Sequence, residues 1–235
     1  MSSETVHVAF PASEQLHLTT DGFIRRMRDG ADRPEPDTVE QIMTRFVDEA
    51  LQVYFLQPSE MLGLSRGMKR VVHMTAETIS RTTHMVVRRT AGKLDIRQNR
   101  EAAEYMDKMR MMRPDSKGNE VWFISFPISD AMARKAYSAI ELADNGNVDQ
   151  ALPRLTEFLH ELTDVAMYWY FEEPMKLLGF GPVMRRIING AVETTRKACH
   201  GVIKRVFRKL EGEQVQEAAR YMDHLLVEGP YRSDT

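Results

Sequence analysis

The sequence predicts a mainly α-helical protein built from two copies of a four-helix unit, each with one short strand. Three observations predict this fold class. A long, basic, amphipathic stretch occurs twice, at 66–94 and 182–210, and the two copies align without a gap. The offset of 116 residues between them also relates other parts of the chain. Strand-like sequence is confined to one short apolar run in each copy.

Identical residues recur at this offset well outside the basic stretch. They include Phe10-Pro11, Tyr54-Phe55, Leu62-Gly63 and Glu101-Ala102-Ala103, which face Phe126-Pro127, Tyr170-Phe171, Leu178-Gly179 and Glu217-Ala218-Ala219. An ungapped register of this length indicates a tandem duplication, with a first unit at 1–116 and a second at 117–235. The bridge at 113–120 is short and polar. We therefore expect the units to pack as one pseudo-twofold helical body, similar to a fused homodimer.

Each unit opens with an apolar run, Val6–Phe10 or Val121–Phe126, which is followed by a proline. β-branched and aromatic residues in these runs favour a strand. A single short strand is not stable alone, because its backbone groups need a hydrogen-bonding partner. We therefore expect the strands of the two units to pair with each other.

Four helices are expected to follow in each unit. Ser13 and Ser129 stand in N-cap positions before the first helical pattern. Pro58 and Pro174 are expected to disturb or end the second helix, because proline lacks the backbone N–H. The expected helices cover about 13–28, 38–57, 66–94 and 97–112 in the first unit, and about 129–144, 153–173, 182–210 and 213–227 in the second.

Composition places the chain among ordinary globular proteins. Hydrophobic residues make up 43% and charged residues 28%, and the net charge of −2 gives no overall field that favours nucleic acid or membrane. The single cysteine, Cys199, favours a reducing compartment. The start of the chain lacks the basic and apolar segments of a signal peptide, and no apolar run approaches the ~18 residues of a membrane span. We expect a cytoplasmic protein without a transmembrane segment.

The two basic stretches carry the candidate ligand-binding residues. Residues 66–93 hold seven basic side chains and one acidic one, and residues 182–209 hold eight and one. On a helical wheel the apolar residues form one stripe, which is predicted to be buried. On the opposite face Glu, Arg or Lys, His, and Arg or Lys recur at i, i+4, i+7 and i+11, so they are neighbours along the helix. These candidates are Glu77, Arg81, His84 and Arg88, and Glu193, Lys197, His200 and Lys204.

The leading functional hypothesis is a non-enzymatic interaction or regulatory protein that binds a protein partner or an anionic ligand through its helical faces. Nucleic acid is one such anion, and homo-oligomerisation is left open. The sequence contains no Cys-x-x-Cys, no His-Glu-x-x-His and no Ser/His/Asp signature, which favours a binding role over catalysis. The structural alternative is a solvated helix face with weak intrahelical ion pairs.

Three further alternatives remain. One is a metal-binding helical-bundle enzyme that uses Glu and His ligands from each unit, because facing helices of bundles hold di-metal centres in this way. A second is a peripheral membrane or polymer-surface binder, which requires the apolar stripe to be accessible. A third is a phosphorylatable histidine on the basic helix. The metal ligands under the first alternative are Glu77, His84 and Glu101, with Glu193, His200 and Glu217.

Three other features are predicted to be structural. Tyr105 and Tyr221 are expected at the edge of the core, each with one hydrogen bond. The aromatic clusters around Tyr54 and Trp169 are expected to belong to the core, with a pocket as the alternative. Cys199 is expected to be a buried, unreactive thiol.

Overall fold

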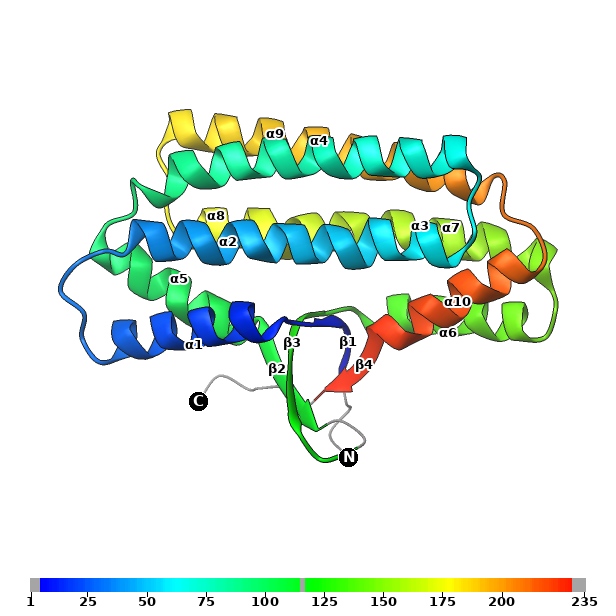
Figure 1. Cartoon of the computed structure of the whole chain (residues 1–235), viewed down its shortest axis with the longest axis horizontal. Coiled ribbons are helices and arrows are strands. Elements are labelled where there is room, and N and C mark those ends of the chain that lie inside the picture. Colours follow the sequence, from blue (N-terminus) through cyan, green and yellow to red (C-terminus); the bar gives the residue numbers. More distant parts are fainter. Residues whose placement is uncertain (1–4, 115–116, 230–235) are drawn as a thin grey trace.

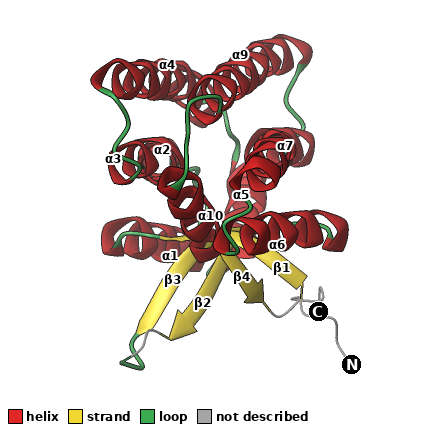
Figure 2. Cartoon of the chain, turned by 90° about the vertical axis from the view of Figure 1, so that its right-hand side faces the viewer, coloured by secondary structure: helices red, strands yellow, loops and turns green. Residues whose placement is uncertain are grey.

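The computed structural model describes residues 5–114 and 117–229. The fold is mainly helical, as the sequence predicts, and it contains one small four-stranded sheet. Helices are stacked in layers on one side of the sheet (Figures 1 and 2). No helix within these two ranges is long and apolar enough to cross a membrane. The first four residues, and residues 115–116 of the expected bridge, lie outside the described residues.

The two apolar runs form the centre of the sheet. Strand β1 (Thr5–Pro11) pairs antiparallel with β3 (Glu120–Pro127), which confirms that these strands are each other's partners. Ala9 lies opposite Ser125, the residue 116 positions further along the chain. The strand order is β2-β3-β1-β4, with β2 (Arg110–Pro114) and β4 (Leu226–Gly229) at the edges.

The expectation of one strand per unit is wrong, because β2 and β4 provide a second strand in each half. The helices expected to reach residues 112 and 227 end at Lys108 and Leu225. The chain then becomes extended and hydrogen-bonds to the open edges of the central pair. Unpaired strand edges leave backbone groups unsatisfied, so this pairing outweighs the helical pattern of the sequence.

Four helices lie next to the sheet: α1 (Glu14–Arg28), α5 (Ile96–Lys108), α6 (Asp130–Asp144) and α10 (Glu213–Leu225). The N-cap predictions are confirmed. The hydroxyl of Ser13 accepts a hydrogen bond from the Leu16 backbone N–H at 3.2 Å, and Ser129 does the same for Met132 at 3.3 Å. Each cap satisfies a backbone donor that the first helical turn leaves free.

The middle layer contains α2 (Pro36–Leu51) and α7 (Val148–Met167), which begin before the expected starts. Each continues through a π-helical turn, η1 (Gln52–Leu56) or η2 (Tyr168–Glu172), into a short helix, α3 (Gln57–Met61) or α8 (Glu173–Leu177). Pro58 and Pro174 are the second residues of these short helices. A proline ring clashes with the carbonyl four residues earlier, and the wider π turn avoids this contact.

The basic stretches form the outer layer, as α4 (Arg66–Ala91) and α9 (Pro182–Phe207). The two helices pack against each other and run in opposite directions, so that α4 begins at the end where α9 finishes (Figure 1). Helix α4 also packs on α2, and α9 packs on α7. The predicted apolar stripe is buried, which is confirmed by residues such as Met184, Ile188 and Val202.

The two halves of the chain share their buried clusters. Leu62 and Leu64 of the first half belong to a cluster made mostly of second-half residues, and Leu178 belongs to a cluster made mostly of first-half residues. The side-chain amide of Gln214 donates to the Leu62 carbonyl at 2.8 Å, and Gln98 donates to the Leu178 carbonyl at 2.6 Å. Donors and acceptors of these two hydrogen bonds are related by the 116-residue offset.

Candidate functional site

The candidate residues of α4 do not form one site. Glu77 is largely exposed and pairs with Arg81 one turn further along the same helix. His84 points the other way, onto α2, where its Nε2 lies 3.0 Å from Asp48 Oδ1 and 3.3 Å from the Thr44 carbonyl. Arg88 also reaches α2, through an ion pair with Glu40 at 3.1 Å. The first two residues therefore face solvent, and the last two fasten α4 to the middle layer.

The second copy divides in a similar way. Glu193 pairs with Lys197 at 3.2 Å on the exposed face of α9. His200 faces α7, where its Nε2 lies 3.6 Å from Asp164 Oδ1 and its ring meets that of His160 edge to face. Burial lowers the pKa of His160, and the neighbouring His200 lowers it further. Lys204 is exposed and has no ion-pair partner among the described residues.

The residues proposed as metal ligands are not brought together. Among the described residues no group of three or more His, Cys, Asp or Glu side chains could hold a metal ion. Glu77 and Glu193 face solvent, whereas Glu101 forms an ion pair with Arg97 along α5. Residues seven apart lie on nearly the same side of a helix, so the spacing itself does not separate them. Their partners do: Glu77 pairs with Arg81 on its own helix, whereas His84 contacts Asp48 on α2.

Basic side chains without a charged partner gather at the two ends of the outer layer. The Glu–Arg and Glu–Lys pairs neutralise the middle of α4 and α9. Among the described residues, the exposed basic side chains of these helices and the following turns that form no ion pair are Arg66, Arg70, Lys204, Arg205, Arg208 and Lys209 at one end, and Arg89, Lys93, Arg185 and Arg186 at the other.

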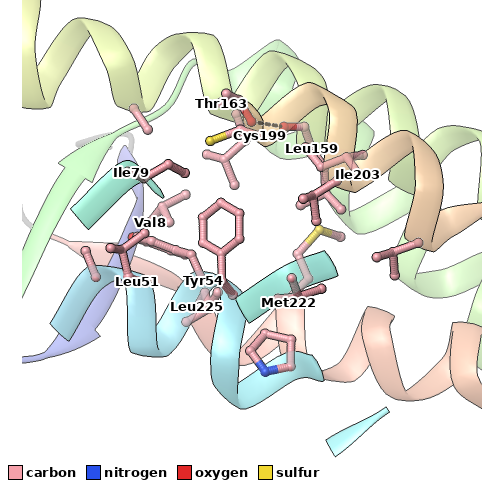
Figure 3. A pocket seen from close by; sticks show the side chains of 18 of the residues that line it. Val8, Leu51, Tyr54, Ile79, Leu159, Thr163, Cys199, Ile203, Met222 and Leu225 are labelled. Atoms are coloured by element: carbon pink, nitrogen blue, oxygen red, sulfur yellow. Dashed lines mark hydrogen bonds between the residues drawn. The ribbon is translucent and has the colours of Figure 1, made fainter. Parts of the chain in front are cut away.

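Two apolar cavities lie beneath this layer, with volumes of about 230 Å³ and 160 Å³. Phe46, Tyr170 and Phe171 line both of them. In the larger cavity, side chains of α7, α9 and α10 face residues of the first half (Figure 3). The aromatic clusters of the sequence thus belong to the core and also line pockets. Burial raises the pKa of the Cys199 thiol in this wall to about 12, as expected for an unreactive cysteine.

The two π turns bring polar groups of the core together. The hydroxyl oxygens of Tyr54 and Tyr170 lie 3.3 Å apart, and burial raises the pKa of both phenols. Tyr105 and Tyr221 each donate one hydrogen bond, to the carbonyls of Trp169 and Val53 respectively, which confirms the prediction for these residues. Each acceptor lies in a π turn, in the half of the chain opposite to its tyrosine donor.

Two features of this region could not be identified from the sequence. The helical wheel predicts which side chains of α4 and α9 are exposed. Which of the basic ones remain without an ion-pair partner is determined by the acidic residues of α2 and α7 that reach the outer helices. The cavities depend on how tightly the aromatic and aliphatic side chains fill the space between layers, and no periodicity encodes this. In comparisons with protein-family models, curated proteins and solved structures, nothing matches this chain.

Proposed function

We propose that this chain is a non-enzymatic binding protein that recognises an acidic protein surface through the outer face of α4 and α9. The observation that supports this function is the set of exposed, unpaired basic side chains at both ends of the helix pair. We propose the cytoplasm as its compartment, since a chain with one cysteine cannot form an internal disulfide, which is typical of reducing compartments.

We also propose that the chain is a tandem duplication, with units at 1–116 and 117–235, whose copies pack about a pseudo-twofold axis as one body. The pairing of Ala9 with Ser125 supports this axis, because the two residues are equivalent under the 116-residue offset. The two amide hydrogen bonds between the halves, from Gln98 and Gln214, support it in the same way. Under this proposal the pseudo-twofold axis relates the two basic ends of the outer layer to each other.

The distribution of charge favours a protein partner over nucleic acid. Arg70 and Arg89, which mark the two ends on α4, are separated by roughly 30 Å at 1.5 Å per residue. Between them the charge is neutralised by Glu77 and its partner, whereas a nucleic-acid groove needs continuous positive charge along the phosphates. Met74 and Met85 are 58% and 45% exposed in this middle part. Exposed Met and Arg together are typical of protein interfaces.

A membrane surface is less well supported. A helix that lies in the membrane interface inserts its apolar face into the lipid. The apolar stripes of α4 and α9 are instead packed against each other and against the middle layer, so that Ile79 and Ile188 are each 5% exposed. Opening the layers to expose these stripes would remove much of the core.

Binding of fluorescein-labelled poly-L-glutamate at low salt tests the function, with fluorescence anisotropy as the readout. The double variant Arg70→Ala plus Arg186→Ala removes one unpaired charge from each end, and we expect the affinity to fall roughly tenfold. The matched control is Arg81→Ala plus Lys197→Ala, which removes two charges that are paired with Glu77 and Glu193. This control should change the affinity by less than about threefold.

Two outcomes would contradict the proposal. Equal losses in the two double variants would mean that total charge, and not the unpaired ends, determines binding. Tighter binding of a duplex DNA oligonucleotide than of poly-L-glutamate at the same salt concentration would identify nucleic acid as the partner class instead. Light scattering on the free protein would first establish whether it self-associates.

A further inference from the structure

The larger cavity combines an apolar wall with two hydroxyl groups that have no hydrogen-bond partner. We propose that it binds a single aliphatic chain that ends in a neutral oxygen group, such as an alcohol or a carbonyl. The site lies on the inner side of α4 and α9, opposite the basic ends, so this inference is independent of the function proposed above.

The size and lining of the cavity support an apolar ligand. Its volume is about 230 Å³, compared with roughly 150 Å³ for an engineered apolar cavity that binds benzene. The side chains that surround it are mainly aliphatic and aromatic, including Val8, Leu51, Ile79, Ile203 and Leu225 (Figure 3). A ligand longer than a single aromatic ring therefore fits between the layers, and burying it would be favourable in proportion to its apolar area.

Thr83 and Thr195 provide the polar contact. They lie on the facing helices α4 and α9, line the same cavity, and are only 2% and 3% exposed. Neither hydroxyl has a hydrogen-bond partner within the described part of the chain. An unpaired buried hydroxyl is unfavourable, so two of them in one wall indicate a group that they are built to contact. Each hydroxyl is able to donate to a ligand oxygen.

The other hydroxyls near the cavities are paired, which makes these two threonines distinctive. Thr163, in the wall of the larger cavity, donates to the Leu159 carbonyl (Figure 3). In the smaller cavity Thr20 and Thr90 donate to backbone carbonyls of their own helices. At the 116-residue offset Thr83 corresponds to Cys199, and Thr195 corresponds to Ile79. The smaller cavity has no equivalent pair of free hydroxyls among its described lining residues.

The lining also determines the charge of the ligand. No Lys, Arg, Asp or Glu side chain is among the residues that line the larger cavity in the described part of the chain. A carboxylate in this position would lose its hydration without gaining a counter-ion, which is strongly unfavourable. A neutral alcohol or carbonyl oxygen loses much less and regains a hydrogen bond from a threonine hydroxyl. The oxygen group is therefore neutral.

Titration of the intact protein with 1-octanol tests the site, and the NMR signals of methionine methyl groups report its location. Met222 lines the larger cavity, and Met106, its counterpart at the 116-residue offset, lines the smaller one. We expect the Met222 signal to shift in a saturable way while Met106 changes little. Octanoate at pH 8 should bind at least tenfold more weakly than octanol, because its charge is buried without a partner.

The double variant Thr83→Val plus Thr195→Val keeps the shape of the wall and removes both hydroxyls. We expect its affinity for octanol to fall about tenfold, to that of n-octane, while its thermal unfolding temperature rises because the unpaired hydroxyls are gone. Ala218→Leu, which fills the larger cavity, should abolish the Met222 shift. Its matched control, Ala102→Leu in the smaller cavity, should leave that shift intact.

The proposal is wrong if octanol leaves the Met222 signal unchanged in the native chain. This test does not depend on the folding of any variant. The proposal is also wrong if the valine double variant binds octanol as tightly as the native chain. That second result would mean that the two hydroxyls contact only buried water. A primary response at Met106 would place the ligand in the smaller cavity and would equally overturn the assignment.

Discussion

The hydroxyl of Tyr221 donates a 2.8 Å hydrogen bond to the backbone carbonyl of Val53, in the opposite half of the chain. In the π turn η1 the Gln57 N–H bonds to the Gln52 carbonyl, so the next donor in this register is residue 58. Residue 58 is proline, which has no N–H. The tyrosine therefore supplies the donor that the helix lacks, and Tyr105 does the same for the Trp169 carbonyl five residues before Pro174.

Tyr221→Phe should lower the free energy of unfolding by about 2 kcal/mol, because the Val53 carbonyl is then buried without a donor. In the double variant Pro58→Ala plus Tyr221→Phe, the new N–H at residue 58 can bond to that carbonyl. We therefore expect the tyrosine substitution to cost less in the Pro58→Ala background than in the native one. Urea unfolding of the four proteins in the cycle measures this coupling. Additive losses would show that the two residues do not serve the same carbonyl.

This relationship also shows where prediction from sequence ends. The prolines at 58 and 174 indicate that the second helix is disturbed, and the copied tyrosines indicate one hydrogen bond each. Neither observation reveals that the two disturbances are connected, because Tyr221 and Pro58 lie far apart in the chain. Sequence periodicity describes one element at a time, whereas a donor supplied across two halves is a property of their packing.

The strands show the same limit of prediction from sequence. The runs at Val6–Phe10 and Val121–Phe126 contain β-branched and aromatic residues, so propensity alone identifies them. Strand β2 has the sequence RMMRP, whose Met and Arg residues favour helices. It becomes a strand because the edge of β3 offers hydrogen-bonding partners. Tertiary context outweighs propensity here, and the expected helix was therefore too long.

For the candidate site, the outward position of Glu77 and the buried stripe of α4 were predictable from the wheel. The inward position of His84 was not, because it lies on the boundary between the two faces. Its contact with Asp48 depends on the crossing of α2 and α4. The unpaired ends and the cavities likewise depend on distances between helices, which the order of residues along one helix does not specify.

Arg110 provides a second prediction, since its guanidinium is buried at the edge of the sheet. The side chain is 4% exposed, donates to Asp107 at 2.8 Å and lies over the Trp122 ring. Burial acts to raise the pKa of Asp107, but hydrogen bonds from Arg110 and Arg28 hold it below its usual value. Arg110→Leu should cost about 3 kcal/mol, because breaking a buried pair leaves a carboxylate with fewer partners.

The control for this substitution is Arg113→Leu, which lies on the same strand but is only partly buried. We expect its cost to stay below about 0.5 kcal/mol. The second half offers a natural comparison, because Leu226 occupies the position equivalent to Arg110. Similar losses for both arginine variants in urea unfolding would contradict the assigned role of Arg110.

His7 gives a prediction about pH. Both ring nitrogens are buried without a partner among the described residues, and burial lowers the pKa of the imidazole below 6.5. Well above pH 6.5 the ring is neutral in both the folded and the unfolded chain. Below pH 6.5 the unfolded chain binds a proton that the folded chain resists, so the free energy of unfolding falls as the pH decreases.

His7→Phe introduces the residue found at the equivalent position 123. Between pH 7.5 and 5.5 the free energy of unfolding of this variant should fall by about 1 kcal/mol less than that of the native chain. Urea unfolding at several pH values measures this difference. His17 and His160 also have lowered pKa values, so part of the acid sensitivity should remain. His224→Gln, at an exposed position, serves as the control and should leave the pH dependence unchanged. An identical slope in the His7 variant would contradict the prediction.

The last prediction separates the outward-facing and inward-facing candidate residues of α4. His84→Ala removes the contacts with Asp48 and Thr44, and because this side chain is only 24% exposed we expect a loss of about 1 kcal/mol. Glu77→Ala removes an exposed intrahelical ion pair, for which we expect less than about 0.5 kcal/mol. Urea unfolding at pH 7.5 compares the two variants. If Glu77→Ala cost as much as His84→Ala, the outward and inward roles assigned to these residues would be wrong.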